Sequence, residues 1–241
     1  MKLIEDYPGS PEELIAIDEL FLARAEQGRS GETLRFWGSE EYFVVVGRAG
    51  KLEKECFNKQ CAEDGIKIVR RISGGGTVLQ GKGCLNYSLI LAYGDNGAYR
   101  RINASFHEIL TKLSDELNQR GMISRTQGVS DLATNGRKFS GNAQARKKRF
   151  FLIHGTVLLD FDINRISRYL KHPEAEPDYR KGRSHDCFVT NLNMTSAGIK
   201  DAVMNVFPPR EGGISIGCEE KKELKLLVDN KYAKEDWTRC F

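Results

Sequence analysis

The stretch that decides the fold is VSDLATNGRKFSGNAQARKKRFFLIHGTVLL, residues 129–159. It contains three strand-like runs, at 129–134, 137–144 and 151–159. Asn135-Gly136 joins the first two, and this dipeptide between such runs is the strongest short-range signal of a two-residue hairpin. The runs are too close together for crossover helices, so the stretch predicts antiparallel strands and disfavours a doubly wound parallel sheet.

Strands and helices alternate irregularly around this stretch. Further strands are expected at 33–37, 42–46, 66–69 and 84–91, and helices at 11–27, 52–63, 99–119, 164–170 and 195–205, with the charged tail 219–237 helical in part. The first helix has the clearest start, because Ser10 suits the N-cap, Pro11 the first helical position and Glu13 the capping box. The sequence predicts an α/β (α+β) fold, in which a mixed, largely antiparallel sheet is flanked by helices.

The length fits one large domain, or one domain with a small appendage, and we take residues 1–241 as a single domain. Hydrophobic residues make up 40% of the chain and charged residues 29%, which is enough for a core and a well-solvated surface. No apolar run approaches the roughly 20 residues that cross a bilayer. The N-terminus carries acids and a proline where a secretory signal is apolar. We therefore expect a cytoplasmic protein without a membrane partner.

The charge pattern leaves one cluster open to two interpretations. The net charge is only +4, and the densest basic run is Arg146-Lys-Lys-Arg149. It is either a solvated hairpin turn or a docking patch for an acidic partner. No aromatic residues alternate with basic ones in a stripe, so nucleic acid is not expected as a partner.

The six cysteines, at positions 56, 61, 84, 187, 218 and 240, have no metal-ligand spacing. In a cytoplasmic chain they are expected to be reduced and mostly buried. The sequence predicts no protein-bound metal site.

A glycine-rich segment, Arg70-Arg-Ile-Ser-Gly-Gly-Gly-Thr-Val-Leu-Gln-Gly-Lys-Gly83, is the first candidate for chemistry. Backbone N–H groups without Cβ atoms can surround an anion, and the two arginines suit phosphate. The alternative is a flexible turn. Residues 76–82 spell GxxxxGK, but Gly83 stands where a P-loop needs Ser or Thr, and a strand follows where a P-loop has a helix. A dinucleotide fingerprint is absent as well.

Two further segments carry polar groups. Lys138 follows the predicted hairpin, with Ser140 expected on the same face of the strand. A hairpin lysine taken alone is usually solvated. His154 is either a catalytic base or a structural histidine at the start of a strand. Each of these signals is weak on its own, and only their combination in one chain is informative.

Together these segments resemble the lipoate–protein ligases. The motifs, in order, are Arg71-x-Ser-Gly-Gly-Gly-Thr-Val78, Cys84-Leu-Asn-Tyr-Ser88, Asp131-Leu132, Arg137-Lys-Phe-Ser-Gly-Asn-Ala-Gln144, His154-Gly-Thr-Val-Leu-Leu-Asp160 and Val189-Thr-Asn-Leu192. The resemblance covers roughly residues 10–237. It implies the fold shared by biotin ligases and class II aminoacyl-tRNA synthetases.

The resemblance also implies a site and a reaction. Lys138 would be the catalytic cation between the acyl carboxylate and the α-phosphate of ATP, with Mg²⁺ as the metal that accompanies ATP. Residues binding substrate and nucleotide would be Arg71, Ser73, Gly74, Gly75, Gly76, Thr77, Val78, Leu79, Asn86, Asp131, Ser140, Gly141, Asn142, Ala143, His154, Gly155 and Thr156. The chain would activate lipoate, or octanoate, as acyl-AMP. We further expect Val44, Val46 and Leu89 to line the groove for the acyl chain.

The carriers implied by the resemblance are lipoyl domains of 2-oxoacid dehydrogenase E2 subunits and the glycine-cleavage H protein. The larger ligases have an additional C-terminal domain, which some relatives supply as a separate small protein, so this short form is expected to need an accessory partner or to use preformed lipoyl-AMP. Sister octanoyltransferases transfer from acyl-carrier protein through a cysteine, without ATP. Cys84 and Cys187 do not match their cysteine positions and are expected to be packed thiols. Transfer without ATP stays the alternative, and a non-catalytic binding protein a third hypothesis.

Overall fold

The computed structural model describes residues 1–210 and 213–240. The larger of two sheets has the strand order β1-β2-β6-β10-β9-β8-β7 and the smaller β4-β3-β5. The strands of the large sheet are β1 (Lys2–Ile4), β2 (Thr33–Trp37), β6 (Cys84–Ala92), β10 (Phe150–Leu158), β9 (Arg137–Arg146), β8 (Asp131–Thr134) and β7 (Arg125–Gln127). Those of the small sheet are β3 (Phe43–Val46), β4 (Lys67–Arg70) and β5 (Val78–Gln80).

Most neighbouring strands are antiparallel, and only the β1–β2 and β3–β4 pairs are parallel among the described strands. The mixed, largely antiparallel sheet predicted from the sequence is confirmed. The β8–β9 hairpin turns at Asn135 and Gly136, whose φ angles are 48° and 73°. Positive φ at both central residues is what a type I′ hairpin turn requires, and it explains the Asn-Gly pair.

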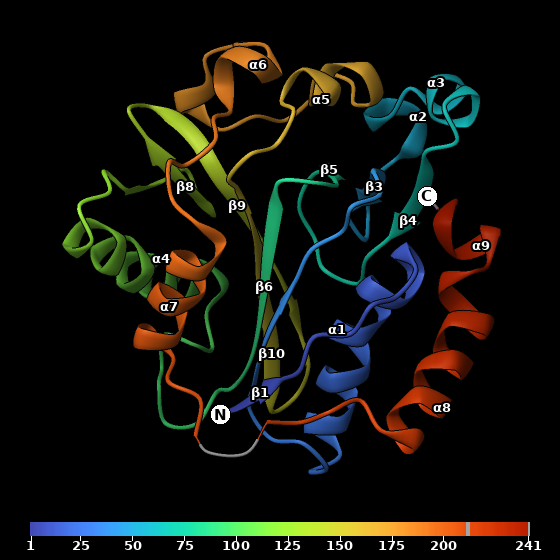
Figure 1. Cartoon of the computed structure of the whole chain (residues 1–241), viewed down its shortest axis with the longest axis vertical. Coiled ribbons are helices and arrows are strands. Elements are labelled where there is room, and N and C mark those ends of the chain that lie inside the picture. The colour runs from blue at the N-terminus through green and yellow to red at the C-terminus, as the bar shows by residue number, and fades with distance from the viewer. Residues whose placement is uncertain (211–212, 241) are drawn as a thin grey trace.

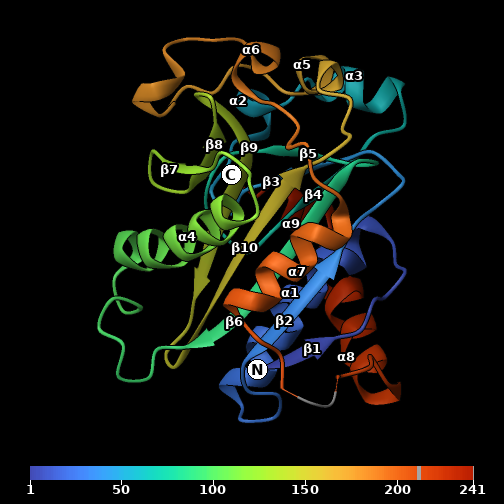
Figure 2. The same ribbon diagram turned by 60° about the vertical axis from the view of Figure 1, so that its left-hand side comes forward.

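Helices cover both faces of the large sheet. On one face lie α1 (Pro11–Glu26) and, outside it, α8 (Cys218–Leu227). On the other lie α4 (Ile102–Gln119) and α7 (Ser196–Val206). Figure 1 shows these two helices to the left of β6 and β10, and Figure 2, turned by 60°, shows them in front of the long strands. The capping box of α1 is present, because Glu13 N–H donates to Ser10 Oγ at 3.3 Å and Ser10 N–H to Glu13 Oε2 at 2.9 Å.

Short helices surround the small sheet and the C-terminal region. They are α2 (Leu52–Glu55), α3 (Asn58–Glu63), α5 (Asn164–Tyr169), η1 (Asp178–Arg180), α6 (His185–Phe188), the π-helical η2 (Val228–Tyr232) and α9 (Glu235–Thr238). Within the described residues, no helix has the length and apolarity to cross a bilayer.

The structure corrects two of the predicted elements. The helix expected at 52–63 is broken at Cys56, which is extended and forms an isolated bridge with Leu170. Its neighbour Phe57 donates its N–H to Tyr169 O at 2.9 Å, so a tertiary contact replaces the helical pattern. The run expected at 129–134 becomes a strand only at Asp131, because Gly128 turns the chain with a φ of 55°. The short strands β1, β5 and β7 were not predicted.

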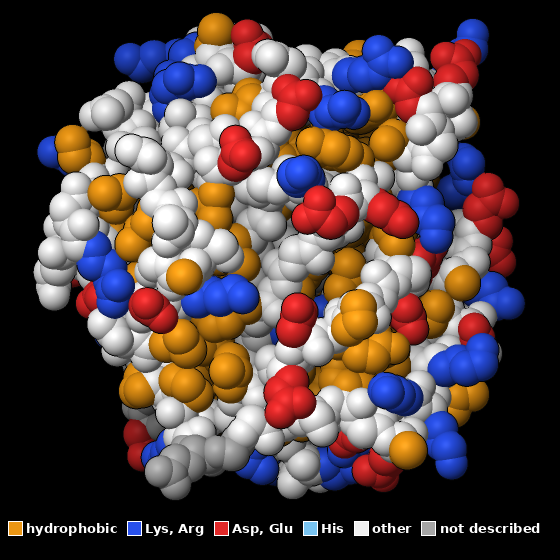
Figure 3. Space-filling view, in the orientation of Figure 1, with side chains coloured by type: hydrophobic (Ala, Val, Ile, Leu, Met, Phe, Trp, Pro, Cys, Tyr) orange, Lys and Arg blue, Asp and Glu red, His pale blue; other side chains and the backbone are white. Residues whose placement is uncertain are grey.

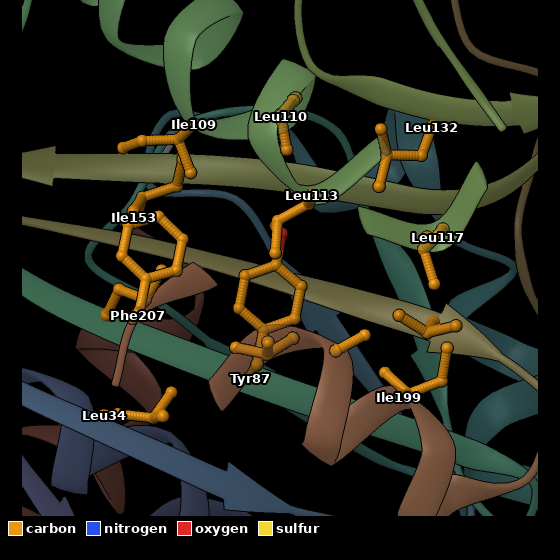
Figure 4. Close-up of a cluster of buried hydrophobic side chains, with 14 of the residues drawn as sticks. Leu34, Tyr87, Ile109, Leu110, Leu113, Leu117, Leu132, Ile153, Ile199 and Phe207 are labelled. Atoms are coloured by element: carbon orange, nitrogen blue, oxygen red, sulfur yellow. The ribbon is translucent and has the colours of Figure 1, made fainter. Parts of the chain in front are cut away.

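The core consists of three clusters of buried apolar side chains. The largest lies between the sheet and α4 and α7, where Tyr87, Leu113 and Ile199 meet (Figure 4). The prediction that Val44, Val46 and Leu89 line a groove for the acyl chain is wrong. All three are fully buried, and Leu89 belongs to the cluster under α4 whereas the two valines belong to the cluster around the small sheet.

In the basic run 146–149, Arg146 ends β9 and the other three residues form the turn to β10. Arg146 lies with its guanidinium 5.0 Å from the ring centres of Tyr93 and Phe151, and Arg149 pairs with Glu26. The hairpin-turn interpretation is confirmed, although two of its four cations are engaged within the chain. Basic and acidic side chains are also interspersed over the face seen in Figure 3. A docking role for the run stays a prediction.

Candidate active site

Lys138 and Asp131 form an ion pair across the β8–β9 hairpin. Nζ of Lys138 lies 2.7 Å from Asp131 Oδ1, and the lysine side chain is 28% exposed whereas that of the aspartate is 9% exposed. The lysine passes over Gly141, where an added Cβ would lie 2.6 Å from its Cε and from its Nζ. The glycine therefore leaves room for the lysine to lie along its own strand.

The other oxygen of this carboxylate is bound by a tyrosine from a distant segment. Tyr179, in η1, donates its hydroxyl to Asp131 Oδ2 at 2.8 Å. Burial, and then the charge of Asp131, raise the pKa of the Tyr179 hydroxyl. The segment 171–189 is tied to the same hairpin, because Val189 forms an isolated bridge with Lys138. No local pattern indicated Tyr179 as a site residue, since its contact joins residues 48 positions apart.

The structure corrects the expectation that Ser140 shares the face of Lys138. A register shift between Leu132 and Ala133 pairs Ser140 with Leu132 and Lys138 with Ala133. Adjacent residues on β8 point to opposite faces, so this β-bulge sends Ser140 to the core under α4. The Ser140 hydroxyl is buried there without a hydrogen-bond partner among the described residues.

Asn142 and Gly155 also lie on the core side. The Tyr87 hydroxyl donates to Asn142 Oδ1, and Asn142 Nδ2 donates to Ser130 O at 2.8 Å. A Cβ at Gly155 would come within 1.9 Å of Asn142 Oδ1 and 2.9 Å of Tyr87 Cε1. The glycine thus leaves room for this buried contact between β6 and β9, whereas the resemblance had implied that Asn142 and Gly155 bind substrate or nucleotide.

Arg71 is enclosed by the glycine-rich loop. Its Nε donates to Ser73 Oγ at 2.9 Å, and its Nη2 donates to Gly74 O and Gly76 O at 2.6 and 2.8 Å. Burial lowers the pKa of the guanidinium to about 10, partly offset by the charge of Glu55, so it stays protonated at neutral pH. By donating to these carbonyls, Arg71 stabilises the conformation of the loop.

The loop rests on the strand that carries Lys138. The N–H of Gly74 donates to Gln144 O at 3.3 Å, and a Cβ at Gly75 would lie 3.9 Å from Ala143 Cβ. Gly75 has a φ of 83°, which favours glycine. At the far end of the loop, Thr77 donates its hydroxyl to Glu55 of α2. The loop and the lysine are therefore both placed by β9.

Beyond Thr77 the chain enters β5. Val78 is half-buried, whereas Leu79 is buried in the cluster around the small sheet. Leu79 was expected to contact the nucleotide, and here its side chain serves the core.

His154 connects the loop to α1. Its Nε2 lies 2.6 Å from Ser73 Oγ, and its Nδ1 lies 2.8 Å from Asp18 Oδ2. Asp18 also accepts from Ser88 Oγ at 2.9 Å and from Arg35 Nη1 at 3.2 Å. Burial acts to raise the pKa of the Asp18 carboxyl, but the hydrogen bond and charge of His154 and the charge of Arg35 together lower it. From the sequence alone, His154 could be a catalytic base or a structural histidine. Asp18 and Arg35 were not predicted as its neighbours.

Asn86 and Thr156 join the two sheets. Gln80 of β5 donates to Asn86 Oδ1 at 3.0 Å and to Thr156 Oγ1 at 2.7 Å, and Asn86 Nδ2 returns a hydrogen bond to Gln80 Oε1 at 2.9 Å. These two predicted site residues therefore support the angle between the sheets. Gln80 was not predicted as a site residue, because nothing in the local sequence distinguishes it from other polar strand residues.

Strand pairing explains how distant motifs meet. Residues paired directly across strands share a face, and one row runs across the sheet through Asp131, Gly141, Thr156, Asn86 and Trp37. The next row on that face contains Ala143, His154, Ser88 and Arg35. The motifs at 84–88, 131–132, 137–144 and 154–160 thus contribute strands β6, β8, β9 and β10 to this surface.

The cysteines divide into two sets. Cys84 is buried, as expected, and burial raises the pKa of its thiol to about 12. Cys187 is exposed in α6, so the expectation of a packed thiol is wrong for it. The helix α6 is only four residues long and buries Phe188 in place of the cysteine. In residues 1–210 and 213–240, no cluster of three or more His, Cys, Asp or Glu side chains could hold a metal ion.

This geometry belongs to a chain that matches a known class of catalytic domain. Residues 10–207 match the family described as the lipoyl protein ligase A/B catalytic domain. The chain belongs to this family.

Two curated relatives show the range of names within the family. A protein of Mycoplasma pneumoniae named "Probable lipoate-protein ligase A" is 30% identical over 229 residues, covering 92% of this chain and 66% of that protein. The octanoyltransferase LipM of Clostridioides difficile is 30% identical over 181 residues, covering 67% of this chain and 66% of that protein. The chain thus aligns with just under two thirds of each relative's length.

A solved structure shows the same fold. It comes from a study of an archaeal lipoylation system, a bi-partite lipoate protein ligase and its E2 lipoyl domain from Thermoplasma acidophilum. The TM-score is 0.82 at 23% identity, and the match covers 99% of this chain and 95% of that chain.

Proposed function

We propose that the chain is an ATP-dependent ligase that activates lipoate, or octanoate, as acyl-AMP and transfers the acyl group to a lysine of a lipoyl carrier domain. The proposal takes residues 1–241 as one catalytic domain. The observation that carries it is the placement of a cation and a glycine-rich anion loop by one strand. Lys138 lies over Gly141, while the loop is hydrogen-bonded to Gln144 and packs on Ala143.

The first step brings two anions together. A carboxylate oxygen of the acid attacks the α-phosphorus of ATP, the bond from that phosphorus to pyrophosphate breaks, and pyrophosphate leaves. Two negative charges about 4 Å apart repel strongly in a site shielded from water. The ammonium of Lys138 and the N–H groups of the loop would offset this charge as it develops.

The second step needs no nucleophile from the protein. The lysine amine of the carrier attacks the carbonyl carbon of the acyl-AMP, the bond to the AMP oxygen breaks, and the amine loses a proton. The site has only to position the two reactants. Mg²⁺ would enter bound to the phosphates of ATP, which is how this ion commonly binds.

The proposed carriers are lipoyl domains of 2-oxoacid dehydrogenase E2 subunits and the glycine-cleavage H protein. A bi-partite ligase has the same fold at nearly full coverage, which supports adding a separate accessory protein in the assay. Such a protein would be required if this chain forms the acyl-AMP only together with a partner, whereas transfer from preformed lipoyl-AMP would proceed without it.

The deciding experiment is lipoylation of a purified lipoyl domain, with lipoate in the presence and absence of ATP and Mg²⁺, and then with lipoyl-AMP. The proposal expects pyrophosphate release that requires both lipoate and ATP, and a domain heavier by one lipoyl group. Product from lipoyl-AMP alone identifies a transfer enzyme. No product from either donor, with and without an accessory protein, contradicts a ligase.

A second candidate is octanoyl transfer from acyl-carrier protein without ATP. One observation favours it, because Cys187 is exposed and lies two residues before Val189, which bridges to Lys138. Mass spectrometry after incubation with octanoyl-carrier protein would show an octanoyl adduct that Cys187→Ala removes. If neither Cys187 nor Cys84 carries an adduct, the thioester route is excluded.

A further inference from the structure

Two adjacent arginines at the end of β4 extend to different parts of the molecule. Arg71 lies inside the glycine-rich loop, as described above. Arg70 is fully buried, and its Nε and Nη2 donate to the carbonyls of Trp237 and Thr238 in α9, at 2.8–3.1 Å. Figure 1 shows α9 beside β4. A C-terminal helix thus meets the strand that leads into the loop.

The same guanidinium holds a turn of the chain. Nη1 of Arg70 donates to the carbonyls of Gly47, Arg48 and Gly50, at 2.7, 3.1 and 2.8 Å. Carbonyls at the last turn of a helix lack partners within the helix, and a cation is favourable there. Arg70 therefore joins the end of α9 to the turn 47–50.

The turn 47–50 supports the glycine-rich loop along its length. Arg48 N–H donates to Ser73 O at 2.8 Å. A Cβ on Gly47 would lie only 2.0 Å from Gly75 O, so the two backbones are in contact. Gly50 lies against Glu55, the residue that accepts from Thr77. A shift of the turn would displace the loop at its beginning, middle and end.

The helix α9 is itself fixed to β4 and to α1. Trp237 Nε1 donates to Arg70 O at 2.9 Å, and its ring centre lies 4.0 Å from Lys231 Nζ. Lys231 and Tyr232 both bind Glu19 of α1, each at 2.7 Å. The contacts of Trp237 therefore place the α9 carbonyls relative to the sheet.

We propose that α9 is a positioning element of the glycine-rich loop, and that Arg70 and Trp237 are its positioning residues. The α9 carbonyls hold Arg70, Arg70 holds the turn 47–50, and the turn shapes residues 73–77. The inference rests on the proposed function only in naming the phosphates of ATP as the ligand of the loop. These C-terminal residues lie outside the range 10–207 that matches the family.

Hydrogen–deuterium exchange on the ligand-free full chain tests the positioning directly. Trp237→Phe removes one N–H donor and keeps an aromatic ring, and Arg70→Lys removes the branched guanidinium. We expect amides in peptides covering 47–50 and 73–77 to exchange about tenfold faster in both variants, with α4 and α7 unchanged. The matched control is Arg239→Ala, which removes only the exposed pair with Glu235. Faster exchange confined to 228–238 would overturn the proposal.

A kinetic test separates positioning from general support of the fold. In Trp237→Phe, at a temperature well below unfolding, we expect KM for ATP to rise about fivefold while KM for lipoate stays within about twofold. An unchanged KM for ATP, despite faster exchange of the loop, would overturn the positioning role. If the wild-type chain has no ATP-dependent activity with or without an accessory protein, ATP-dependent activation fails as the proposed function, and the exchange experiment still decides whether α9 holds the loop.

Discussion

The ammonium of Lys138 and the carboxylate of Asp131 lie 2.7 Å apart, with the lysine chain resting on Gly141. Asp131 and Gly141 therefore preorganise the position of the Lys138 ammonium. Replacing Lys138 with Ala should reduce acyl-AMP formation by about 10²–10³-fold, as losing one charge-stabilising donor does in other enzymes. The free energy of unfolding, measured in urea, should change by at most about 1 kcal/mol, because the ion pair is partly exposed. Intact lipoylation by this variant would show that the site is elsewhere.

Gly141→Ala should uncouple activity from stability. The new Cβ would meet the far end of the lysine side chain, which can move away at small cost. We expect the melting temperature to stay nearly unchanged while kcat falls by about tenfold or more, because the cation is displaced. Gly155→Ala is the contrasting variant. Its Cβ would collide with Asn142 and Tyr87 in the core, and it should cost about 1–3 kcal/mol of unfolding free energy.

Ser140→Ala tests the bulge. Because the Ser140 hydroxyl is buried without a partner in the described parts of the chain, removing it should leave stability unchanged or raise it by up to about 1 kcal/mol. Activity should equal that of the wild type. A large rise in KM for ATP or lipoate would mean that this hydroxyl faces the substrates after all.

Asp18→Asn should remove a pH-dependent part of the stability. The variant leaves Arg35 buried with a neutral partner, and we expect a loss of about 3 kcal/mol at pH 7. The folded-state pKa of Asp18 lies below its ordinary value of 3.8. Its contribution is therefore present above pH 4 and is lost as the pH falls through the lowered folded-state pKa.

Urea unfolding of both proteins across that pH range measures the effect. The gap in unfolding free energy between wild type and Asp18→Asn should be widest at neutral pH and should narrow below pH 4. Ser88→Ala, which removes one hydrogen bond to the same carboxylate, is the control and should cost about 1 kcal/mol. A gap that stays constant down to pH 2 would contradict the lowered pKa.

Thiol labelling should separate the cysteines into two sets. Cys187, Cys218 and Cys240 are exposed, whereas Cys56, Cys61 and Cys84 are buried. Burial raises the thiol pKa of Cys56 and of Cys84 to about 12. A thiol reagent at pH 8 should therefore modify three cysteines quickly in the native protein and all six after unfolding. Fast native labelling of Cys84 would contradict its buried position.

Local patterns were sufficient to predict most of the fold. The Asn135-Gly136 turn, the capping box at Ser10 and the long amphipathic helix at 102–119 each follow from short-range chemistry that the fold keeps. The break in the helix at 52–63 was missed because its cause is a contact with Leu170, far away in the sequence.

The candidate site was predictable in part for the same reason. The motifs identified the loop, Lys138 and His154. Strand pairing brings Lys138 and His154 onto one face of the large sheet, and the contacts of Gly74 with Gln144 and of Ser73 with His154 place the loop there. The side on which Ser140 and Asn142 lie depends on a bulge, which no periodicity reveals. Partners such as Gln80, Tyr179 and Asp18 are recognisable only when the strands and helices that carry them are assembled.

The hydrogen-bonded group of Gln80, Asn86 and Thr156 spans two sheets, and the two principal parts of the site belong to different sheets. The glycine-rich loop connects strands of the small sheet, whereas Lys138 belongs to the large one. The distance between Lys138 and the loop therefore depends on the angle between the two sheets, which these side-chain amides hold, together with the backbone hydrogen bond from Gly74 to Gln144. Shortening Gln80 or Asn86 would remove contacts between the sheets and so alter that distance without changing the lysine itself.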